Sequence, residues 1–109
     1  MKLLTEAIKK ATPALYANEG RTPDETPITA KFFTPDSSWT WYMTEMDPEQ
    51  GLAYGYTRND AMPDCAELGY FSLEELRTLR GGLGLPVERD RHYGRHTLAE
   101  VMAGEMTAR

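Results

Sequence analysis

His92 and His96 are the pair of side chains whose spacing most directly suggests chemistry. Two imidazoles that stand four residues apart on a helix face the same way and can share a metal ion. Gly94 lies between them and Thr97, a residue suited to cap a helix, follows directly, so this segment is predicted to be a loop. The chain offers three conceivable further ligands, Glu88, Asp90 and Cys65. No third ligand is announced by spacing, and we expect exposed histidines and no metal.

Other residue types that carry out catalysis stand in unfavourable contexts. Cys65, the only cysteine, lies in an acidic loop, and nearby negative charge disfavours the reactive thiolate. Asp36 precedes two serines in a turn, where aspartate commonly hydrogen-bonds to the backbone. The glycine cluster at 81–84 follows a predicted helix and lacks the Lys-Ser/Thr of a phosphate-binding loop. We therefore expect no catalytic residues and no cofactor.

A charged segment late in the chain could form a ligand pocket. Its candidate residues are Arg80, Glu88, Arg89, Asp90 and His92. If these side chains converge beside a concave apolar surface, the protein is a small enzyme or a ligand-binding domain. If they extend separately into solvent, that alternative loses its support.

Arginines in the same part of the chain also raise the possibility of nucleic-acid binding. They are Arg77, Arg80, Arg89, Arg91 and Arg95. Such side chains can bind phosphates while aromatic rings stack on bases. The whole chain is acidic, however, with 17 Asp and Glu against 12 Lys and Arg, whereas nucleic-acid binders usually carry a basic surface. This function is possible but disfavoured.

Large aromatic side chains favour a protein-binding function. Rings occur on both faces of the predicted strands, for example at the adjacent positions Trp41 and Tyr42. A sheet with one open face normally alternates apolar and polar residues. Either helices cover both faces, or one face keeps an aromatic patch for a partner. We expect the second arrangement, with a partner-binding surface formed by Trp39, Trp41, Tyr42, Tyr54 and Tyr56.

The sequence predicts an antiparallel sheet that positions these residues. Residues 28–45 contain two runs of aromatic and β-branched residues around a Pro-Asp-Ser-Ser turn, which indicates a hairpin. Alternation places Ile28 with Ala30 and Phe32 on one face. Residues 52–57 form a third strand, in which Gly55 indicates a bulge or a close contact. Residues 67–71 form a fourth strand, and residues 85–89 could add an edge strand.

Three short helices complete the predicted fold. Thr5 is a suitable N-cap for the first helix. Ser72 with Glu75, and Thr97 with Glu100, have the spacing of capping boxes. Leu73, Leu76 and Leu79 would form the buried stripe of the helix that begins after Ser72. The predicted fold class is α+β, an antiparallel sheet of four to five strands with short helices packed mainly on one face.

Length and composition set the broad class. A chain of 109 residues fits a single domain, 1–109, because domains commonly contain about 100–150 residues. No apolar run approaches the ~20 residues that span a bilayer, and the N-terminus lacks a signal-peptide core. With one cysteine an internal disulfide is impossible, and we expect a cytoplasmic protein.

Several phrases of the sequence resemble a small bacterial family catalogued as domain of unknown function 2958. They are LLT near the N-terminus, LYANEG, KFFTPDSSWTWYMTE, ELGYFSLEEL and RGGLGLPVERD. The resemblance extends from about Leu3 to Val101, with more divergence around Gly55–Cys65. It implies a stand-alone protein often carried on plasmids, integrative elements or phages, and it supplies no catalytic residues.

The sequence therefore favours a non-enzymatic protein-interaction accessory of a mobile genetic element. The expected partner is another protein, without membrane association, and the oligomeric state stays open. The small enzyme or ligand-binding domain is the first alternative, and the nucleic-acid binder is the second.

Overall fold

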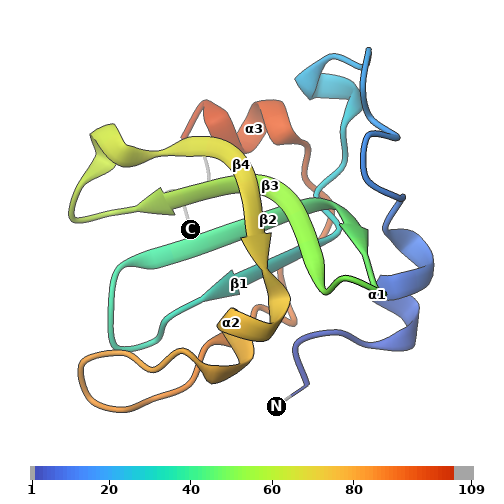
Figure 1. Cartoon of the computed structure of the whole chain (residues 1–109). Coiled ribbons are helices and arrows are strands. Elements are labelled where there is room, and N and C mark those ends of the chain that lie inside the picture. The colour runs from blue at the N-terminus through green and yellow to red at the C-terminus, as the bar shows by residue number, and fades with distance from the viewer. Residues whose placement is uncertain (1, 105–109) are drawn as a thin grey trace.

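A single antiparallel sheet of five strands forms the centre of the molecule in the computed structural model, which describes residues 2–104 (Figure 1). The strands are β1 (Ala30–Phe33), β2 (Trp39–Asp47), β3 (Leu52–Asn59), β4 (Glu67–Ser72) and β5 (Glu88–Arg89), in the spatial order β4-β3-β2-β1-β5. The helices are α1 (Glu6–Ala11), α2 (Leu73–Thr78) and α3 (Leu98–Met102). Short 3₁₀ turns occupy Pro23–Glu25 and Pro63–Cys65. The predicted α+β class is confirmed.

Local hydrogen bonds begin the helices at the predicted residues. The Thr5 hydroxyl accepts from the Ile8 amide at 3.1 Å, and the Ser72 hydroxyl accepts from the Glu75 amide at 3.1 Å. Thr97 and Glu100 form both halves of the predicted capping box. At Ser72 only the serine half forms, and the prediction that Glu75 completes a capping box there is wrong. Each cap satisfies an amide that lacks a partner within its own helix.

The prediction that Leu79 belongs to the buried stripe of α2 is wrong. Leu73 and Leu76 are buried, but α2 ends at Thr78 and Leu79 is the C-cap, 39% exposed. The backbone of Leu79 is extended, so its side chain no longer follows the buried stripe of α2 and lines a surface groove instead.

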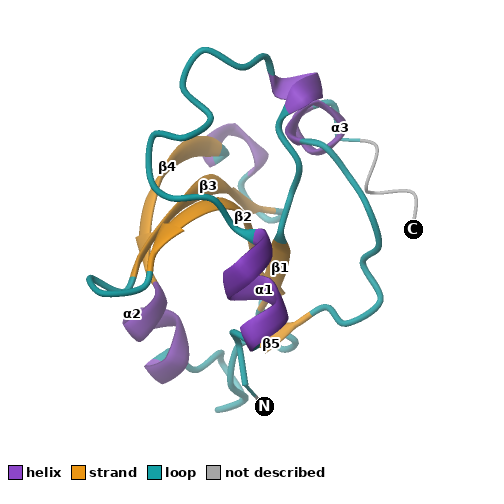
Figure 2. Ribbon diagram, turned by 90° about the vertical axis from the view of Figure 1, so that its right-hand side faces the viewer, coloured by secondary structure: helices purple, strands orange, loops and turns teal. Residues whose placement is uncertain are grey.

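Helices cover both faces of the sheet, although unequally (Figure 2). The face that carries α1 and α2 holds the larger core, in which Phe32, Trp41, Met43 and Met46 meet Leu76. The opposite face carries α3 and the segment that precedes it. Its smaller core consists of Ile28, Tyr42, Leu98 and Val101. The prediction that Ile28 shares a face with Ala30 and Phe32 is wrong, because β1 begins only at Ala30.

A β-bulge at Thr44 changes the face of the sheet to which the following side chains of β2 point. Met43 pairs with Gly55, and the next register pair joins Glu45 to Tyr54, so Thr44 is the extra residue. Without it, strict alternation would direct Glu45 into the larger core; with it, Glu45 faces the other side and Met46 enters that core. Gly55 opposite the bulge confirms the interpretation of a glycine at a bulge or close contact.

Candidate functional site

The two tryptophans line a groove at one end of the sheet. Trp39 and Trp41 alternate onto the same face of β2, and their rings stack with centroids 6.1 Å apart and an interplanar angle of 17°. Trp41 is 8% exposed, whereas Trp39 is half-buried. We call this recess of about 570 Å³ the Trp groove. Its lining residues are Thr34, Ser37, Trp39, Trp41, Leu79, Arg80, Gly81 and Gly82.

Asp36 fixes the loop that forms the far wall of the Trp groove. Its Oδ2 atom accepts hydrogen bonds from the amides of Leu83 at 2.7 Å and Leu85 at 3.1 Å. A Cβ atom added at Gly81 would lie 1.6 Å from Asp36 Oδ1, so the carboxylate packs directly on this glycine. Asp36 therefore has a structural role, as predicted, but it acts on a loop 47–49 residues away and not on its own turn.

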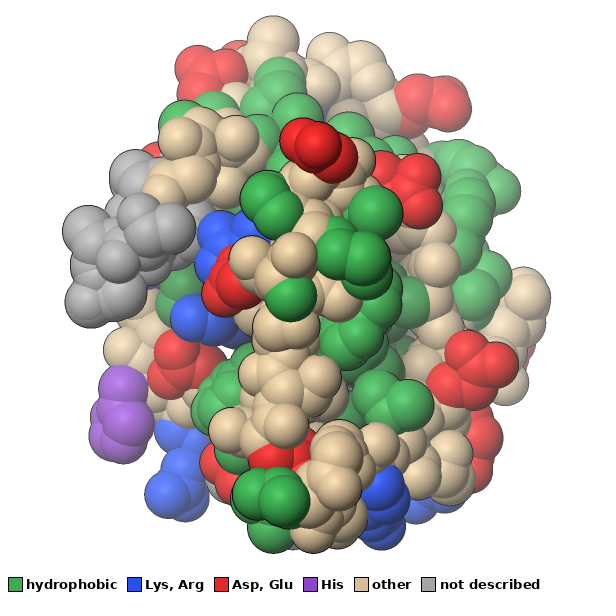
Figure 3. Space-filling model, turned by 90° about the vertical axis from the view of Figure 1, so that its left-hand side faces the viewer, with side chains coloured by type: hydrophobic (Ala, Val, Ile, Leu, Met, Phe, Trp, Pro, Cys, Tyr) green, Lys and Arg blue, Asp and Glu red, His purple; other side chains and the backbone are tan. Residues whose placement is uncertain are grey.

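The fixed loop displays three leucines to solvent. Leu79 is 39% exposed, Leu83 is 83% exposed and Leu85 is 44% exposed. Figure 3 shows one face of the molecule, on which hydrophobic side chains are interrupted by polar, acidic and basic ones. Single exposed apolar residues are ordinary, but here Leu79 lines the Trp groove, and Leu83 and Leu85 follow closely in the sequence on the loop that Asp36 anchors.

Arg80 adds a positive charge to the rim of the Trp groove. Its guanidinium donates hydrogen bonds to the carbonyls of Arg77 at 3.2 Å and Leu79 at 2.8 Å. Within residues 2–104, no acidic side chain forms an ion pair with Arg80. The groove therefore offers aromatic and aliphatic surface next to a cation that forms no ion pair with the part of the chain that the structure describes.

The predicted partner-binding aromatics do not form one surface. Tyr42 points to the opposite face from the tryptophans, is fully buried against α3 and is unavailable to a partner. Tyr54 and Tyr56 lie on that same opposite face and are half-buried. Trp39 and Trp41 alone reach the Trp groove, and Trp41 presents little surface. Strand alternation separates the five residues into two groups.

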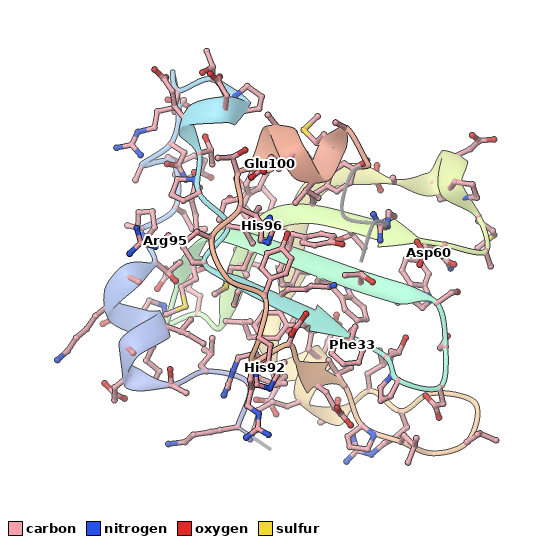
Figure 4. All side chains as sticks on the ribbon, turned by 180° about the vertical axis from the view of Figure 1, so that it is seen from behind. Phe33, Asp60, His92, Arg95, His96 and Glu100 are labelled. Carbon is pink, nitrogen blue, oxygen red and sulfur yellow. The ribbon has the colours of Figure 1, made fainter. Side chains whose placement is uncertain are left out.

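Most of the predicted ligand-pocket residues do surround one recess. Glu88, Arg89, Asp90 and His92 line an open hollow of about 640 Å³, which we call the charged hollow, together with Phe33 and residues of β1–β3 (Figure 4). Arg80 does not belong to it and lies in the Trp groove instead.

Two ion pairs lie among the residues that line the charged hollow. Lys31 Nζ lies 3.6 Å from Asp90 Oδ2, and Arg58 Nε lies 2.9 Å from Asp60 Oδ1. The Asp90 carboxylate also accepts from the His92 amide at 2.9 Å, while the Arg89 guanidinium donates to the Lys2 carbonyl. Internal pairing leaves these groups poorly disposed toward a charged ligand.

The two histidines are in different environments and do not converge. His92 is exposed, as predicted, but the prediction is wrong for His96, which is half-buried (Figure 4). The Nε2 atom of His96 lies 2.7 Å from the Tyr93 carbonyl oxygen, and its Nδ1 atom lies 3.9 Å from Glu100 Oε1. Among residues 2–104, no group of three or more His, Cys, Asp or Glu side chains is placed to hold a metal ion. Cys65 is exposed. None of the described helices is long and apolar enough to cross a bilayer.

Comparison with known proteins assigns the chain to a family. The model of the family described as protein of unknown function DUF2958 matches residues 3–105. The chain belongs to this family. No curated protein and no solved structure matches the chain. The resemblance inferred from the sequence phrases is thus confirmed, and membership in DUF2958 leaves the activity to be argued from the site.

Sequence reasoning missed the exposed leucines and the anchoring role of Asp36. A signal for the leucines was present, since Leu83 and Leu85 alternate with glycines in a segment too irregular for a buried helix or strand. The contact of Asp36 with that segment joins residues 47 positions apart, and no local pattern encodes it.

A second aromatic cluster surrounds Tyr54 on the other face of the sheet. The Tyr54 and Tyr70 rings meet edge to face with centroids 5.0 Å apart. The pKa of Tyr70 is raised from 10.0 to about 12. The largest cause is a side-chain hydrogen bond with Tyr16, the second is burial, and the third is repulsion from the negative charges of neighbouring groups. Tyr16 and Tyr70 nonetheless remain 63% and 50% exposed.

The raised pKa predicts a loss of stability at high pH. Below pH 10 Tyr70 is protonated in both folded and unfolded chains, and its hydrogen bond contributes fully. Between pH 10 and about 12 only the unfolded chain releases this proton, so the free energy of unfolding falls as pH rises. We expect Tyr16→Phe to shift the Tyr70 midpoint back toward 10 in an NMR titration of labelled tyrosine rings. An unchanged midpoint would refute the role of Tyr16.

Proposed function

We propose that this protein is a non-enzymatic protein-interaction accessory of a mobile genetic element, and that the Trp groove with its three leucines is the docking site. The observation that carries the docking site is the anchored loop that follows the groove residue Leu79 and exposes Leu83 and Leu85. The link to a mobile element rests on the family resemblance, and the cytoplasmic location rests on the single cysteine.

Anchoring distinguishes this surface from a loop that is apolar by chance. The Leu83 and Leu85 amides are both held by one carboxylate, so a partner meets the leucines in a preformed arrangement. Preformed apolar anchors lose little conformational entropy on binding, and aromatic and arginine side chains dominate the energetics of interfaces. The groove offers aromatic, aliphatic and arginine side chains to a partner.

The partner is a protein that presents an apolar side chain flanked by a carboxylate. The apolar side chain would occupy the recess between Trp39 and Leu79, and the carboxylate would pair with Arg80, which has no internal counter-ion in the described chain. A bidentate pair with a guanidinium gives direction to an otherwise non-directional apolar contact.

The other two functions have weaker support. A small enzyme or ligand-binding domain would use the charged hollow, where four of the five predicted residues do meet. Its ion pairs, Lys31–Asp90 and Arg58–Asp60, already engage several of the charged groups that a polar ligand could bind. For nucleic-acid binding, Arg77 is paired with Glu74 at 2.8 Å, and the chain carries a net charge of −5.

Substitutions at the groove test the proposed function. Tagged protein is used to capture partners from nuclease-treated host lysate, and any captured protein is then purified and its affinity measured. Leu83→Asp and Trp39→Ala are each expected to weaken this affinity at least about tenfold, as loss of an interface anchor usually does. Arg80→Glu is expected to weaken it further by opposing the partner's carboxylate.

Met62→Asp is the matched control, because Met62 is also a half-exposed apolar residue on a loop but lies outside the groove. Circular dichroism and an unchanged unfolding midpoint verify that each variant is folded. If the captured protein binds Leu83→Asp and the wild type equally well, the docking site is elsewhere. Retention on nucleic acid that falls steeply with salt would favour the nucleic-acid alternative.

A further inference from the structure

A cavity lined by tyrosines lies on the face of the sheet opposite the Trp groove. Its volume is about 330 Å³, and it lies between β3, β4 and the segment that follows α1. Tyr16, Tyr54 and Tyr70 supply aromatic walls, and Leu68 and Leu98 supply aliphatic ones. We call it the tyrosine cavity. Its size is at the lower end of the roughly 300–1,000 Å³ of small-molecule sites, so it suits a single chemical group.

A buried carboxylate forms part of the lining. Glu45 is 5% exposed, and its two oxygens accept from the backbone amides of Tyr16 at 2.7 Å and Asn18 at 3.1 Å. No Lys, Arg or His of residues 2–104 forms an ion pair with Glu45. The Glu45 carboxylate therefore gives the interior of the cavity a negative potential, while the one cation among its lining residues, Arg21, is exposed. The negative charge of Glu45 is also among the causes that raise the pKa of Tyr70.

Tyr16 is held in an unfavourable backbone conformation. Its φ of 72° is in the left-handed region. Among residues 2–104, Tyr16 is the only residue other than glycine that has a positive φ. Bulky residues rarely adopt this conformation, which persists where surrounding contacts fix it. The Glu45 carboxylate provides that contact by accepting a hydrogen bond from the Tyr16 amide. Glu45 therefore supplies the negative charge of the cavity and also fixes the backbone that positions the Tyr16 ring.

We propose that the tyrosine cavity binds an organic cation, an alkylammonium or guanidinium group on an apolar stem, between the faces and edges of Tyr16, Tyr54 and Tyr70 and in the field of Glu45. Aromatic faces attract cations through the ring quadrupole, most strongly where water is excluded. Leu68 and Leu98 would contact the stem.

The same geometry argues against other ligands. An anion would be repelled by Glu45, which forms no ion pair with a Lys, Arg or His of residues 2–104. A hard metal ion needs several oxygen ligands, but both Glu45 oxygens already accept amide hydrogen bonds. A guanidinium or a methylated ammonium needs no direct coordination by a free carboxylate oxygen, because its charge is spread over a larger and more weakly hydrated surface.

Arg21 is a potential competitor at the mouth of the cavity. It lines the cavity together with Glu19, and its guanidinium donates to Asn18 Oδ1 at 3.3 Å. Arg21 is exposed, so its charge is screened more than that of the buried carboxylate. We expect Arg21→Ala to bind organic cations several times more tightly than the wild type.

The position of β4 suggests how a cation could be delivered. β4 is an edge strand that pairs only with β3, and two of its residues, Leu68 and Tyr70, line the cavity. An extended peptide placed along this edge would bring a Lys or Arg side chain close to the rings. A free amine could enter the same cavity without pairing along β4. In both cases the group bound is the same kind of organic cation.

Titration of the full chain with two cationic probes tests the proposal. The probes are tetramethylammonium and a short capped peptide with a central trimethyllysine, and the neutral controls are neopentanol and the same peptide with norleucine. Binding is followed by NMR of labelled tyrosine rings. We expect saturable shifts of Tyr16, Tyr54 and Tyr70 with the cations, and binding of the neutral controls weaker by roughly tenfold or more. A stronger response to the peptide would identify a protein side chain as the source, and a response to tetramethylammonium alone would identify a free amine.

Variants separate this site from its surroundings. Tyr70→Ala, at a half-exposed position, and Glu45→Gln, which removes the charge and keeps one oxygen to accept from a backbone amide, are each expected to weaken cation binding roughly five- to thirtyfold. Trp39→Ala lies on the other face and should bind the cations normally, so the outcome is independent of the Trp groove. If Glu45→Gln does not fold, Tyr70→Ala decides. Equal binding of cation and neutral control, unchanged binding by folded Tyr70→Ala, or no saturable shift with either cation would overturn the proposal.

Discussion

Replacing Gly55 with alanine is expected to lower the free energy of unfolding by about 3 kcal/mol or more, at the upper end of overpacking substitutions. A Cβ atom at this position would lie 1.8 Å from the Tyr42 carbonyl oxygen and 2.8 Å from its carbon. Both atoms belong to the backbone of β2, which pairs on each side with another strand and cannot move without breaking those pairings. Relief of the clash would require separation of β2 from β3.

Gly69→Ala provides a matched control for Gly55→Ala. Gly69 is the register partner of Gly55 in β4, but a Cβ atom there would have no neighbour within 4 Å. We expect its effect to remain within about 0.5 kcal/mol, as for most open surface positions. Chemical denaturation of both variants measures the difference. Similar midpoints for the two would show that the contact with Tyr42 does not constrain the sheet.

Features encoded by neighbouring residues could be predicted from the sequence. The hairpin, the caps at Thr5, Ser72 and Thr97, and the close contact at Gly55 depend on residues within a few positions or on strand alternation. These patterns express local sterics and backbone hydrogen bonding, which the sequence specifies directly. The α+β class followed from them.

Features that depend on which surface is covered could not be predicted. Alternation correctly separates Trp41 from Tyr42, but it does not tell which of the two faces receives a helix. Both faces are covered here, α3 packing over Tyr42, so the predicted aromatic surface divides between two sides of the molecule. The same uncertainty explains Ile28, whose position before β1 allows it to join the smaller core.

The candidate sites depend on contacts between distant segments. Asp36 reaches Leu83 across 47 residues, and Glu45 reaches Tyr16 across 29. In each case one carboxylate organises the backbone of a loop that has little regular structure of its own. The sequence shows these acids as ordinary surface charges, because burial and backbone partners become visible only when the chain is folded.

Glu45→Ala is expected to lower the free energy of unfolding by about 3 kcal/mol, because hydrogen bonds to a charged group contribute about 1.5–3 kcal/mol each and two amides would lose their acceptor. Part of the loss is offset because the variant no longer buries a charge. The Tyr16 backbone would also be free to leave its left-handed conformation, so the turn after α1 should loosen. Chemical denaturation gives the change in stability, and hydrogen exchange of the Tyr16 and Asn18 amides locates it.

Glu49→Ala removes the same side chain from an exposed position four residues away and is expected to change stability by less than about 0.5 kcal/mol. The stability of Glu45→Gln should lie between those of the wild type and Glu45→Ala. The glutamine oxygen can accept from one backbone amide, while its NH₂ group faces the other donor. This ordering follows from acceptor geometry, because loss of negative charge alone would make the Ala and Gln variants equal. Equal destabilisation by these two variants, with unchanged exchange at Tyr16, would therefore show that Glu45 acts through its charge and does not organise the loop.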